Sequence, residues 1–501
     1  MMGITASQTS FWNPKGGLPL QLINAEQAKA LDVASEQLGV STAQLMENAG
    51  RAVAAFLEAR VDPKKGPIVF FIGKGNNGGD GLVAANQLAQ KKYSVFLIQN
   101  EEDLKKNQSP LQTASYLVDA LLGTGLKGDV QGWMESAIRC INDFQKQGKK
   151  VLAIDIPSGL SAQTGMPYGV AVKATTTLCL GFVKLGLVLC PGFEYAGSIE
   201  CADIGIPKEA TSGVTLPFHL LEPHHFISHF KRRPKDAHKK DFGHVLVVGG
   251  SATMPGAGFL ASFGALRSGA GLVTYATTPE VYQKFDPDFA EVMVASVEKP
   301  ADVLSLCEGK NAVVLGPGLG RESKRLAFAK ELIAKIPLHM VIDADGLLAM
   351  TQRKEAILTP HPGEMAALLK ISVPEVQANR VKVACEAAKI FESIVVLKGY
   401  RSLIAFPDGR LYVNPTGNPG MATAGMGDVL AGILGGFLAQ GFSPESASLA
   451  GVYLHGLAGD MVVEEVGEKG LIASDVLRYM PKAIRLIEQA GNNESYPKSF
   501  Q

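Results

Sequence analysis

Short runs of uninterrupted apolar residues alternate with helix-like segments, and this alternation restricts the fold more than any other feature of the sequence. In the first half, the runs occupy 67–73, 93–98, 116–123 and 150–157. The series restarts with 244–250, 272–277, 312–318, 339–346, 356–364, 394–399 and 402–406. A strand that is apolar on both faces has to be covered on both faces, as in a parallel sheet between two layers of helices. The sequence therefore predicts an α/β protein.

The segment between the two series has a different composition. Residues 216–240 contain three prolines, a group of histidines and the basic run 231–235. A chain of 501 residues is long enough for two or more domains of ~100–200 residues each. We therefore expect two independent α/β domains, one over 1–220 and one over 221–501.

The charge balance restricts the classes of partner. The formal net charge is zero, because 48 Lys and Arg residues balance 48 Asp and Glu residues. Non-specific binding to a polyanion requires clustered Lys and Arg side chains. We therefore expect no nucleic-acid partner, and we interpret the run 231–235 as a solvated linker.

Cysteine usage and hydropathy indicate the compartment. The six cysteines form no CxxC pair, which argues against a disulfide framework or a structural zinc site and favours a reducing compartment. The longest apolar stretch, 178–193, is interrupted by Lys184 and is too short to span a bilayer. The N-terminus lacks the apolar segment of a secretory signal. We expect a soluble cytoplasmic protein with no membrane partner.

Glycine is enriched to 55 of 501 residues, about 11% against a usual ~7%, and three glycine-rich loops follow strands in the first half. These loops are Gly73–Gly81, Gly123–Asp129 and Asp155–Gly159. Ligands of open α/β sheets bind beyond the carboxyl ends of the strands, where bare N–H groups and helix N-termini suit a phosphate. Each loop alone is compatible with a tight turn, but three at one edge, each with an aspartate, predict a binding site.

The second half has its most informative segment at 418–432, where Gly425-Met426-Gly427-Asp428 precedes a predicted helix. An aspartate in that position can exchange a proton beside a bound phosphate. Four further polar segments fall at predicted strand ends: 316–320, 343–345, 359–364 and 398–402. Several such segments in one domain predict a second site. His361, between two prolines, could instead be a packed core histidine.

Two sets of motifs resemble those of a known enzyme family. GNNGGDG, DALLGTGLKGD and DIPSG are similar to the NAD(P)HX epimerase domain. LTPHPGE, VLKG and NPGMATAGMGDVLAG are similar to the ribokinase-like, ADP-dependent NAD(P)HX dehydratase. The resemblance covers about 20–490. It implies a Rossmann-like three-layer α/β/α epimerase domain over 1–220 and a ribokinase-like α/β dehydratase domain over 221–501.

The family acts on a reduced nicotinamide dinucleotide that carries an added hydroxyl group on C6 of the ring, in R and S forms. The resemblance implies that the first domain interconverts the two forms and that the second removes water from the S form. Hydroxide is a poor leaving group. Phosphorylation of the hydroxyl by ADP, which ends as AMP, is the family's means of making it a better one.

The same resemblance assigns residues in the first domain. Those expected to contact the hydrate are Asn76, Asn77, Gly78, Gly79, Asp80, Gly123, Thr124, Gly125, Leu126, Lys127, Gly128, Asp129 and Asp155. Asp155 and Lys127 are expected to carry the acid–base chemistry, although Lys127 could be only a phosphate contact. Asn77, Asp119 and Ser158 are expected to hold a potassium ion, consistent with the oxygen ligands that hard cations take.

In the second domain, the resemblance assigns Ala257, Gly318, His361 and Asp428 to the hydrate. It assigns Lys398, Gly399, Tyr400, Arg401, Ser402 and Gly427 to the adenine nucleotide, which would bind with Mg²⁺. Asp428 is the expected acid–base residue. Related sugar kinases usually have GAGD at this point, and the larger Met426 argues against a sugar-kinase reaction.

The expected partners are two small molecules, NAD(P)H hydrate and ADP, and further copies of the chain in a homo-oligomer, with a tetramer as one candidate. Two other functions compete with this expectation. The first is an ATP-dependent vitamin or sugar kinase of the ribokinase class with an added N-terminal domain, against which the epimerase motifs argue. The second is a binding or scaffold protein, which is disfavoured because all three glycine loops of the first half carry aspartates.

Overall fold

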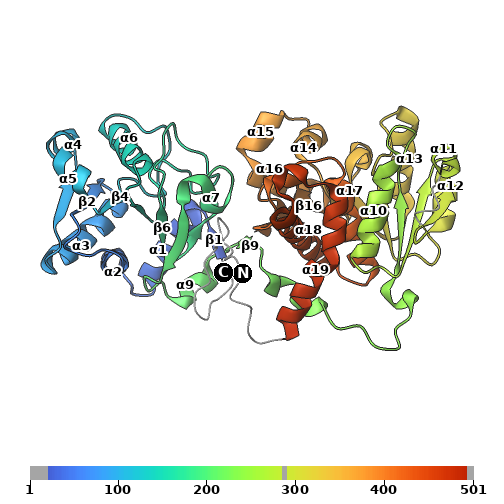
Figure 1. The fold of residues 1–501 in the computed structure, drawn as a ribbon, viewed down its shortest axis with the longest axis horizontal. Helices are drawn as coiled ribbons and strands as arrows, with labels where there is room; N and C mark the ends of the chain where they lie inside the picture. Colours follow the sequence, from blue (N-terminus) through green and yellow to red (C-terminus); the bar gives the residue numbers. More distant parts are fainter. Residues whose placement is uncertain (1–20, 285–289, 493–501) are drawn as a thin grey trace. The chain divides into compact units, whose positions relative to one another are not determined.

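The computed structural model describes residues 21–284 and 290–492, which form two compact units (Figure 1). The first unit ends at Phe218 and the second begins at His219. Both are α/β units, as the alternation predicts. All six cysteines are free, in agreement with the expected lack of disulfides. Within the described ranges, none of the helices is long and apolar enough to cross a membrane.

The first unit contains a six-stranded sheet in which all the neighbouring strands are parallel. Its strands, in spatial order, are β3 (Val95–Ile98), β2 (Ile68–Ile72), β4 (Tyr116–Ala120), β5 (Val151–Ile154), β6 (Thr176–Leu180) and β8 (Ser198–Ala202). A short parallel pair, β1 (Gln21–Ile23) and β7 (Val183–Lys184), lies outside this sheet. The four apolar runs of the first half therefore supply β2, β3, β4 and β5.

Helices cover both faces of this sheet. They are α1 (Ala25–Gln37), α2 (Thr42–Glu58), α3 (Asn76–Gln90), α4 (Glu101–Lys106), α5 (Gln108–Thr113), α6 (Trp133–Lys146), α7 (Leu185–Val188), α8 (Phe193–Ala196) and α9 (Lys208–Gly213). Successive side chains of a strand point to opposite faces. Phe70 accordingly packs with side chains of α2 and α3, whereas Phe71 packs with Ile138 of α6 on the other face. Figure 1 shows α6 on one side of the sheet and α2 and α3 on the other.

The second unit contains seven parallel strands followed by an antiparallel edge. The parallel strands, in spatial order, are β12 (Met293–Ser296), β11 (Leu272–Thr277), β10 (His244–Val248), β13 (Ala312–Leu315), β14 (His339–Ile342), β15 (Ile357–Leu358) and β16 (Ile394–Leu397). The antiparallel edge consists of β17 (Leu403–Ala405) and β18 (Leu411–Val413), and β9 (Phe218–Leu220) is the next neighbour of β18. Leu221 donates its N–H to the carbonyl of Val413, so the start of the second unit is part of this edge.

The helices of the second unit are α10 (Pro255–Arg267), α11 (Pro279–Gln283), α12 (Pro300–Leu306), α13 (Ser323–Lys335), α14 (Pro362–Leu369), α15 (Val373–Ala378), α16 (Arg380–Phe391), α17 (Met426–Ala439), α18 (Pro444–Val466) and α19 (Ala473–Asn492). Helix α17 is buried from Val429 to Ala439 and crosses α10 closely. A Cβ on Gly432 would lie 1.9 Å from the carbonyl oxygen of Ala261 in α10. Glycine at this crossing fixes the position of α17, and with it the segment at its N-terminus.

Two candidate active sites

The first candidate site is a cavity of about 750 Å³ in the first unit, at the carboxyl ends of its strands. The predicted loops meet there, since the lining includes Asn76, Asn77, Asp80, Gly123, Thr124, Gly125, Leu126, Lys127 and Asp155. Four other residues predicted to contact the substrate, Gly78, Gly79, Gly128 and Asp129, are not in the lining. The structure therefore brings together most of the predicted contacts.

Two of these glycines have a packing role. A Cβ on Gly78 would lie 2.0 Å from the carbonyl oxygen of Gly73, and one on Gly79 would lie 2.5 Å from the sulfur of Met46. Both residues lie in the first turns of α3, which begins at Asn76 rather than after the glycine-rich loop. Glycine is needed at these positions so that α3 can pack closely against the end of β2 and against α2.

Asp155 lies directly after β5 with a φ of +66°, in the left-handed region that few non-glycine residues adopt. Its Oδ1 atom accepts a hydrogen bond from the N–H of Leu180 at 2.9 Å and another from the ammonium of Lys184. Lys184 is 2% exposed and also donates to the carbonyl oxygens of Leu180 and Phe182, at 3.2 and 2.9 Å. Although burial lowers the pKa of Lys184, the Asp155 carboxylate raises it, and the net shift is upward.

Lys184 was not among the residues predicted for this site. Lys127, which was predicted to act with Asp155, is exposed in the cavity lining, and the ammonium that contacts Asp155 belongs to Lys184. The sequence does carry a signal, because Lys184 is the charge that interrupts the apolar stretch 178–193. A lysine in such a stretch is buried only when it is paired.

Two further carboxyl groups line the same cavity. Burial, followed by the charge of Asp155, raises the pKa of Asp80 to about 8. Burial also raises the pKa of Asp32 on α1, and Asp155 adds to this effect. The cavity therefore holds one carboxylate paired with a lysine and two further carboxyl groups with a raised pKa.

The residues expected to hold potassium are close together beside this cavity. Asp119 is fully buried and accepts hydrogen bonds from the N–H and the hydroxyl of Ser158, at 2.8 and 2.5 Å. The Asn77 amide donates to the carbonyl of Leu122 at 2.9 Å, and the N–H of Leu122 donates to the Ser158 hydroxyl. Burial raises the pKa of Asp119 to about 6.

The Oδ1 atom of Asn77 is buried and has no hydrogen-bond partner among the described residues. Buried polar atoms normally have a partner, so an atom without one indicates a missing ligand. With the nearby Asp119 and Ser158 oxygen atoms, it forms the kind of donor set that a hard cation takes. The residues present therefore fit a potassium ion.

The second candidate site lies at the carboxyl ends of the second sheet. The ammonium of Lys398, directly after β16, contacts the Asp343 carboxylate at 2.7 Å and the Glu364 carboxylate at 3.6 Å. Asp343 is 1% exposed and also accepts a hydrogen bond from the Thr359 hydroxyl at 2.7 Å. Burial lowers the pKa of Lys398, but the two carboxylates raise it more, so the net shift is upward.

Asp428 enters this group from the N-terminus of α17. The N-cap of the helix is Gly425, whose φ of +86° turns the chain into the helix. A Cβ on Gly427 would lie 3.2 Å from the Lys398 ammonium, which places the first turn of α17 against the ion pair. Burial, followed by the charge of Asp343, raises the pKa of Asp428 to about 7. A carboxyl group with that pKa can take or give a proton near neutral pH.

The structure places the other predicted residues of this unit as follows. Gly318 is next to Ala257, since a Cβ on Gly318 would lie 2.9 Å from that of Ala257. His361 is the N-cap of α14, and its Nδ1 atom accepts from the N–H groups of Gly363 and Glu364 at 3.0 and 3.2 Å. Its side chain is 53% exposed, which excludes the alternative of a core histidine.

The predicted nucleotide segment 398–402 divides into two parts. Lys398 belongs to the carboxylate group described above, whereas Gly399, Tyr400, Arg401 and Ser402 form the turn between β16 and β17. The Arg401 side chain is buried, and its Nη1 atom donates to the carbonyl of Pro415 at 2.8 Å. Asp343 and Glu364 were noted at strand ends but not assigned a role, because their contact with Lys398 joins positions far apart in the sequence.

Comparisons with known proteins cover both units. Residues 245–482 match the family model described as NAD(P)H-hydrate dehydratase, and residues 42–112 and 98–186 match the model described as YjeF-related protein N-terminus. A crystal structure of the ADP/ATP-dependent NAD(P)H-hydrate dehydratase from Bacillus subtilis, co-crystallised with ATP and Mg²⁺, is 31% identical and has a TM-score of 0.50. The match covers 54% of this chain and 98% of that chain.

Relatives that are described as bifunctional match this chain over nearly its whole length. The bifunctional NAD(P)H-hydrate repair enzyme of Moorella thermoacetica is 37% identical in an alignment of 521 positions that covers 94% of this chain and 98% of the relative. The enzyme of the same description from Coxiella burnetii is 38% identical over 92% of this chain and 98% of its own length. Because this similarity extends over nearly all of both proteins, the chain belongs to the family of bifunctional NAD(P)H-hydrate repair enzymes.

Proposed function

We propose that this chain repairs hydrated reduced nicotinamide dinucleotides through two activities. The first unit interconverts the R and S forms of NAD(P)H hydrate. The second unit removes water from the S form at the expense of ADP, which yields NAD(P)H, AMP and phosphate. The observation that carries this proposal is that each unit has its own group of carboxyl side chains with a paired lysine at the carboxyl ends of its strands.

In the first unit, the hydrate occupies the cavity between α1, α3 and the loops after β2, β4 and β5. Asp155 is the acid–base residue, and its contact with Lys184 holds one of its oxygen atoms in place. Asn77, Asp119 and Ser158 hold a potassium ion, which supplies positive charge beside the bound dinucleotide. The unpartnered Asn77 oxygen supports this assignment, and epimerisation is expected to depend on potassium.

In the second unit, Ala257, Gly318 and His361 contact the hydrate, and the 398–402 segment and Gly427 contact the adenine nucleotide. Mg²⁺ binds with the nucleotide, because this ion typically uses phosphate oxygens with few carboxylates. Asp428 moves the proton at the C6 hydroxyl as that group is converted into a better leaving group. The raised pKa of Asp428 supports this role, since proton transfer is most efficient when the pKa is near the working pH.

We infer a cytoplasmic enzyme that works as a homo-oligomer. Light scattering of the purified protein tests the oligomeric state, since a mass near 53.0 kDa would contradict a homo-oligomer.

The proposed function is tested with the purified protein, a mixture of hydrated NADH epimers, ADP, Mg²⁺ and K⁺. The absorbance of the reduced ring should return, with one AMP formed per NADH. A vitamin or sugar kinase would instead phosphorylate a small alcohol with ATP and leave the hydrate unchanged. Absence of NADH formation under these conditions would contradict the proposal.

A further inference from the structure

Two carboxyl groups of the first cavity, those of Asp155 and Asp80, differ in their partners. Asp155 uses its Oδ1 atom for Lys184 and for the N–H of Leu180, and its Oδ2 atom makes no hydrogen bond with the described residues. Lys184 has three acceptors for its three N–H groups, so its charge is fixed in place. Lys184 and Leu180 therefore hold one oxygen of Asp155 in place, and the other oxygen is available to a ligand.

Asp80 has the opposite environment. It lies on α3, lines the cavity and is 8% exposed, and its carboxyl group makes no hydrogen bond or ion pair with the described residues. A buried carboxyl group without a partner favours its neutral form, which can donate a proton. Two carboxyl groups whose environments differ in this way identify an acid and a base in one site.

We propose that Asp80 donates a proton and Asp155 accepts one during epimerisation, with Lys184 as the positioning residue that keeps the two carboxyl groups different. This inference rests on the proposed epimerase function. It assigns to Asp80 a catalytic role in addition to contact with the substrate.

The reaction at C6 then proceeds as follows. Asp80 donates its proton to the C6 hydroxyl, the carbon–oxygen bond breaks, and water leaves with the bonding electron pair. The lone pair of the ring nitrogen forms a double bond to C6. A water molecule adds to the other face of C6 and gives a proton to Asp155. Exchange with solvent returns a proton to Asp80 and removes one from Asp155.

Burial and two neighbouring carboxylates favour the neutral form of Asp80. The charged groups that line the cavity with it are Lys29 and Asp32 of α1, Lys74, Lys127, Asp155 and Lys184. Burial and the charges of Asp155 and Asp32 raise the pKa of Asp80 to about 8, and Lys184 only partly opposes them. R-to-S conversion should therefore decline as the pH rises through about 8.

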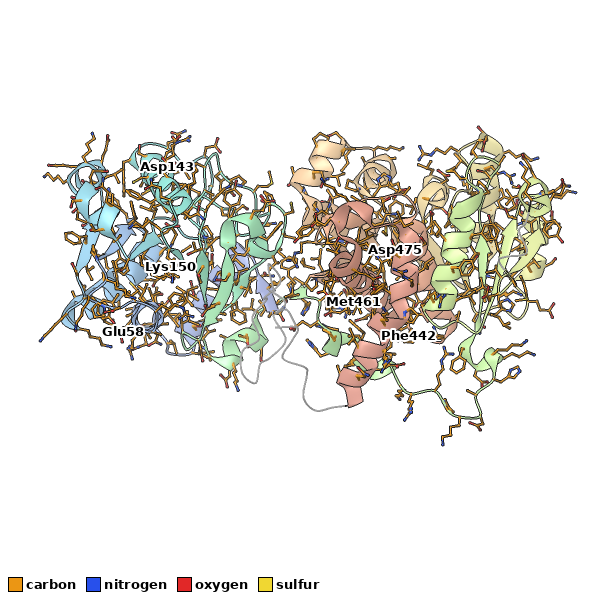
Figure 2. The ribbon with its side chains drawn as sticks, in the orientation of Figure 1. Glu58, Asp143, Lys150, Phe442, Met461 and Asp475 are labelled. Atoms are coloured by element: carbon orange, nitrogen blue, oxygen red, sulfur yellow. The ribbon has the colours of Figure 1, made fainter. Side chains whose placement is uncertain are left out.

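The test compares Asp80→Asn with the wild type in the full-length protein. Asparagine preserves the volume but cannot donate a proton in this way, so kcat for epimerisation should fall by ~10²–10⁴-fold, with KM changed by less than about threefold. Residual activity should lack the decline near pH 8. The matched control is Asp143→Asn on α6, a 66% exposed side chain labelled in Figure 2, which should retain wild-type epimerisation.

Asp80→Glu provides a second variant, because it restores a carboxylic acid and should be at least tenfold more active than Asp80→Asn. The proposal is overturned if Asp80→Asn keeps the wild-type kcat, if only KM changes, or if the two variants are equally inactive. Lack of epimerisation by the wild type would instead overturn the proposed function itself. Dehydration of the pure S form should be the same in all these variants.

Discussion

Single residues in both units show one arrangement, an aspartate after a strand in contact with a lysine that is at least partly buried. Asp155 pairs with Lys184 in the first unit, and Asp343 pairs with Lys398 in the second. In each case, a second aspartate at or near the beginning of a helix, Asp80 or Asp428, has a raised pKa. The pairing fixes one charge so that the other group can exchange protons near neutral pH.

Asp428→Asn tests the role of the second of these groups. Loss of acid–base catalysis should lower the dehydration rate by ~10²–10⁴-fold, while ADP affinity changes little because the N–H groups at the start of α17 remain. The alternative is that Asp428 only caps the helix; asparagine caps well, so this alternative predicts wild-type turnover. The N-cap in the structure is Gly425. Dehydration kinetics and calorimetry of ADP binding decide between the two outcomes.

The same variant should also change the pH dependence of stability. The folded pKa of Asp428 is raised to about 7, so the ionised group destabilises the fold. This cost grows between about pH 4 and 7, because the unfolded chain ionises near 3.9. Asp428→Asn should therefore raise the melting temperature more at pH 8 than at pH 5. An equal change at both pH values would contradict the raised pKa.

At the scale of secondary-structure elements, the close crossing of α10 and α17 positions Asp428. Gly432→Ala would place a Cβ 1.9 Å from the Ala261 carbonyl. Overpacking of this kind costs about 1–3 kcal/mol in the free energy of unfolding, and dehydration should weaken while epimerisation is retained. The matched control is Gly256→Ala in α10, whose Cβ would meet nothing within 4 Å. Denaturant unfolding measures both, and equal stability of the two variants would contradict this role of the crossing.

The bounds of the strands show how much of the fold could be predicted from the sequence. The strand at 272–277 has the predicted bounds, and β2 lies within the predicted run 67–73, because burial on both faces leaves a clear apolar pattern. The glycine loops and Asp155 could be placed at the sheet edge for the same reason. The contact between Lys184 and Asp155 could not be predicted from an apolar pattern, because it depends on the path of the chain that brings β7 close to the end of β5.

At the scale of the whole molecule, we propose that the two activities separate with the two units. A fragment ending at Phe218 should epimerise the hydrate, and one beginning at His219 should dehydrate only the S form. The second fragment should include His219, Leu220 and Leu221, because most of β9 and the Leu221 N–H belong to the edge of its sheet. Circular dichroism should show that each fragment is folded. Two folded but inactive fragments would contradict the independence of the units.

The central claim is that one chain carries two chemically independent sites, and the most direct test uses two inactivated full-length variants. Pure R hydrate is incubated with ADP, Mg²⁺ and K⁺, and the initial rate of NADH formation is measured above the spontaneous background. Asp155→Asn and Asp428→Asn should each fail alone, the first at epimerisation and the second at dehydration. A mixture of the two should form NADH, because the S hydrate made by one variant is consumed by the other. NADH formation by either variant alone at the wild-type rate, or none from the mixture, would contradict the account.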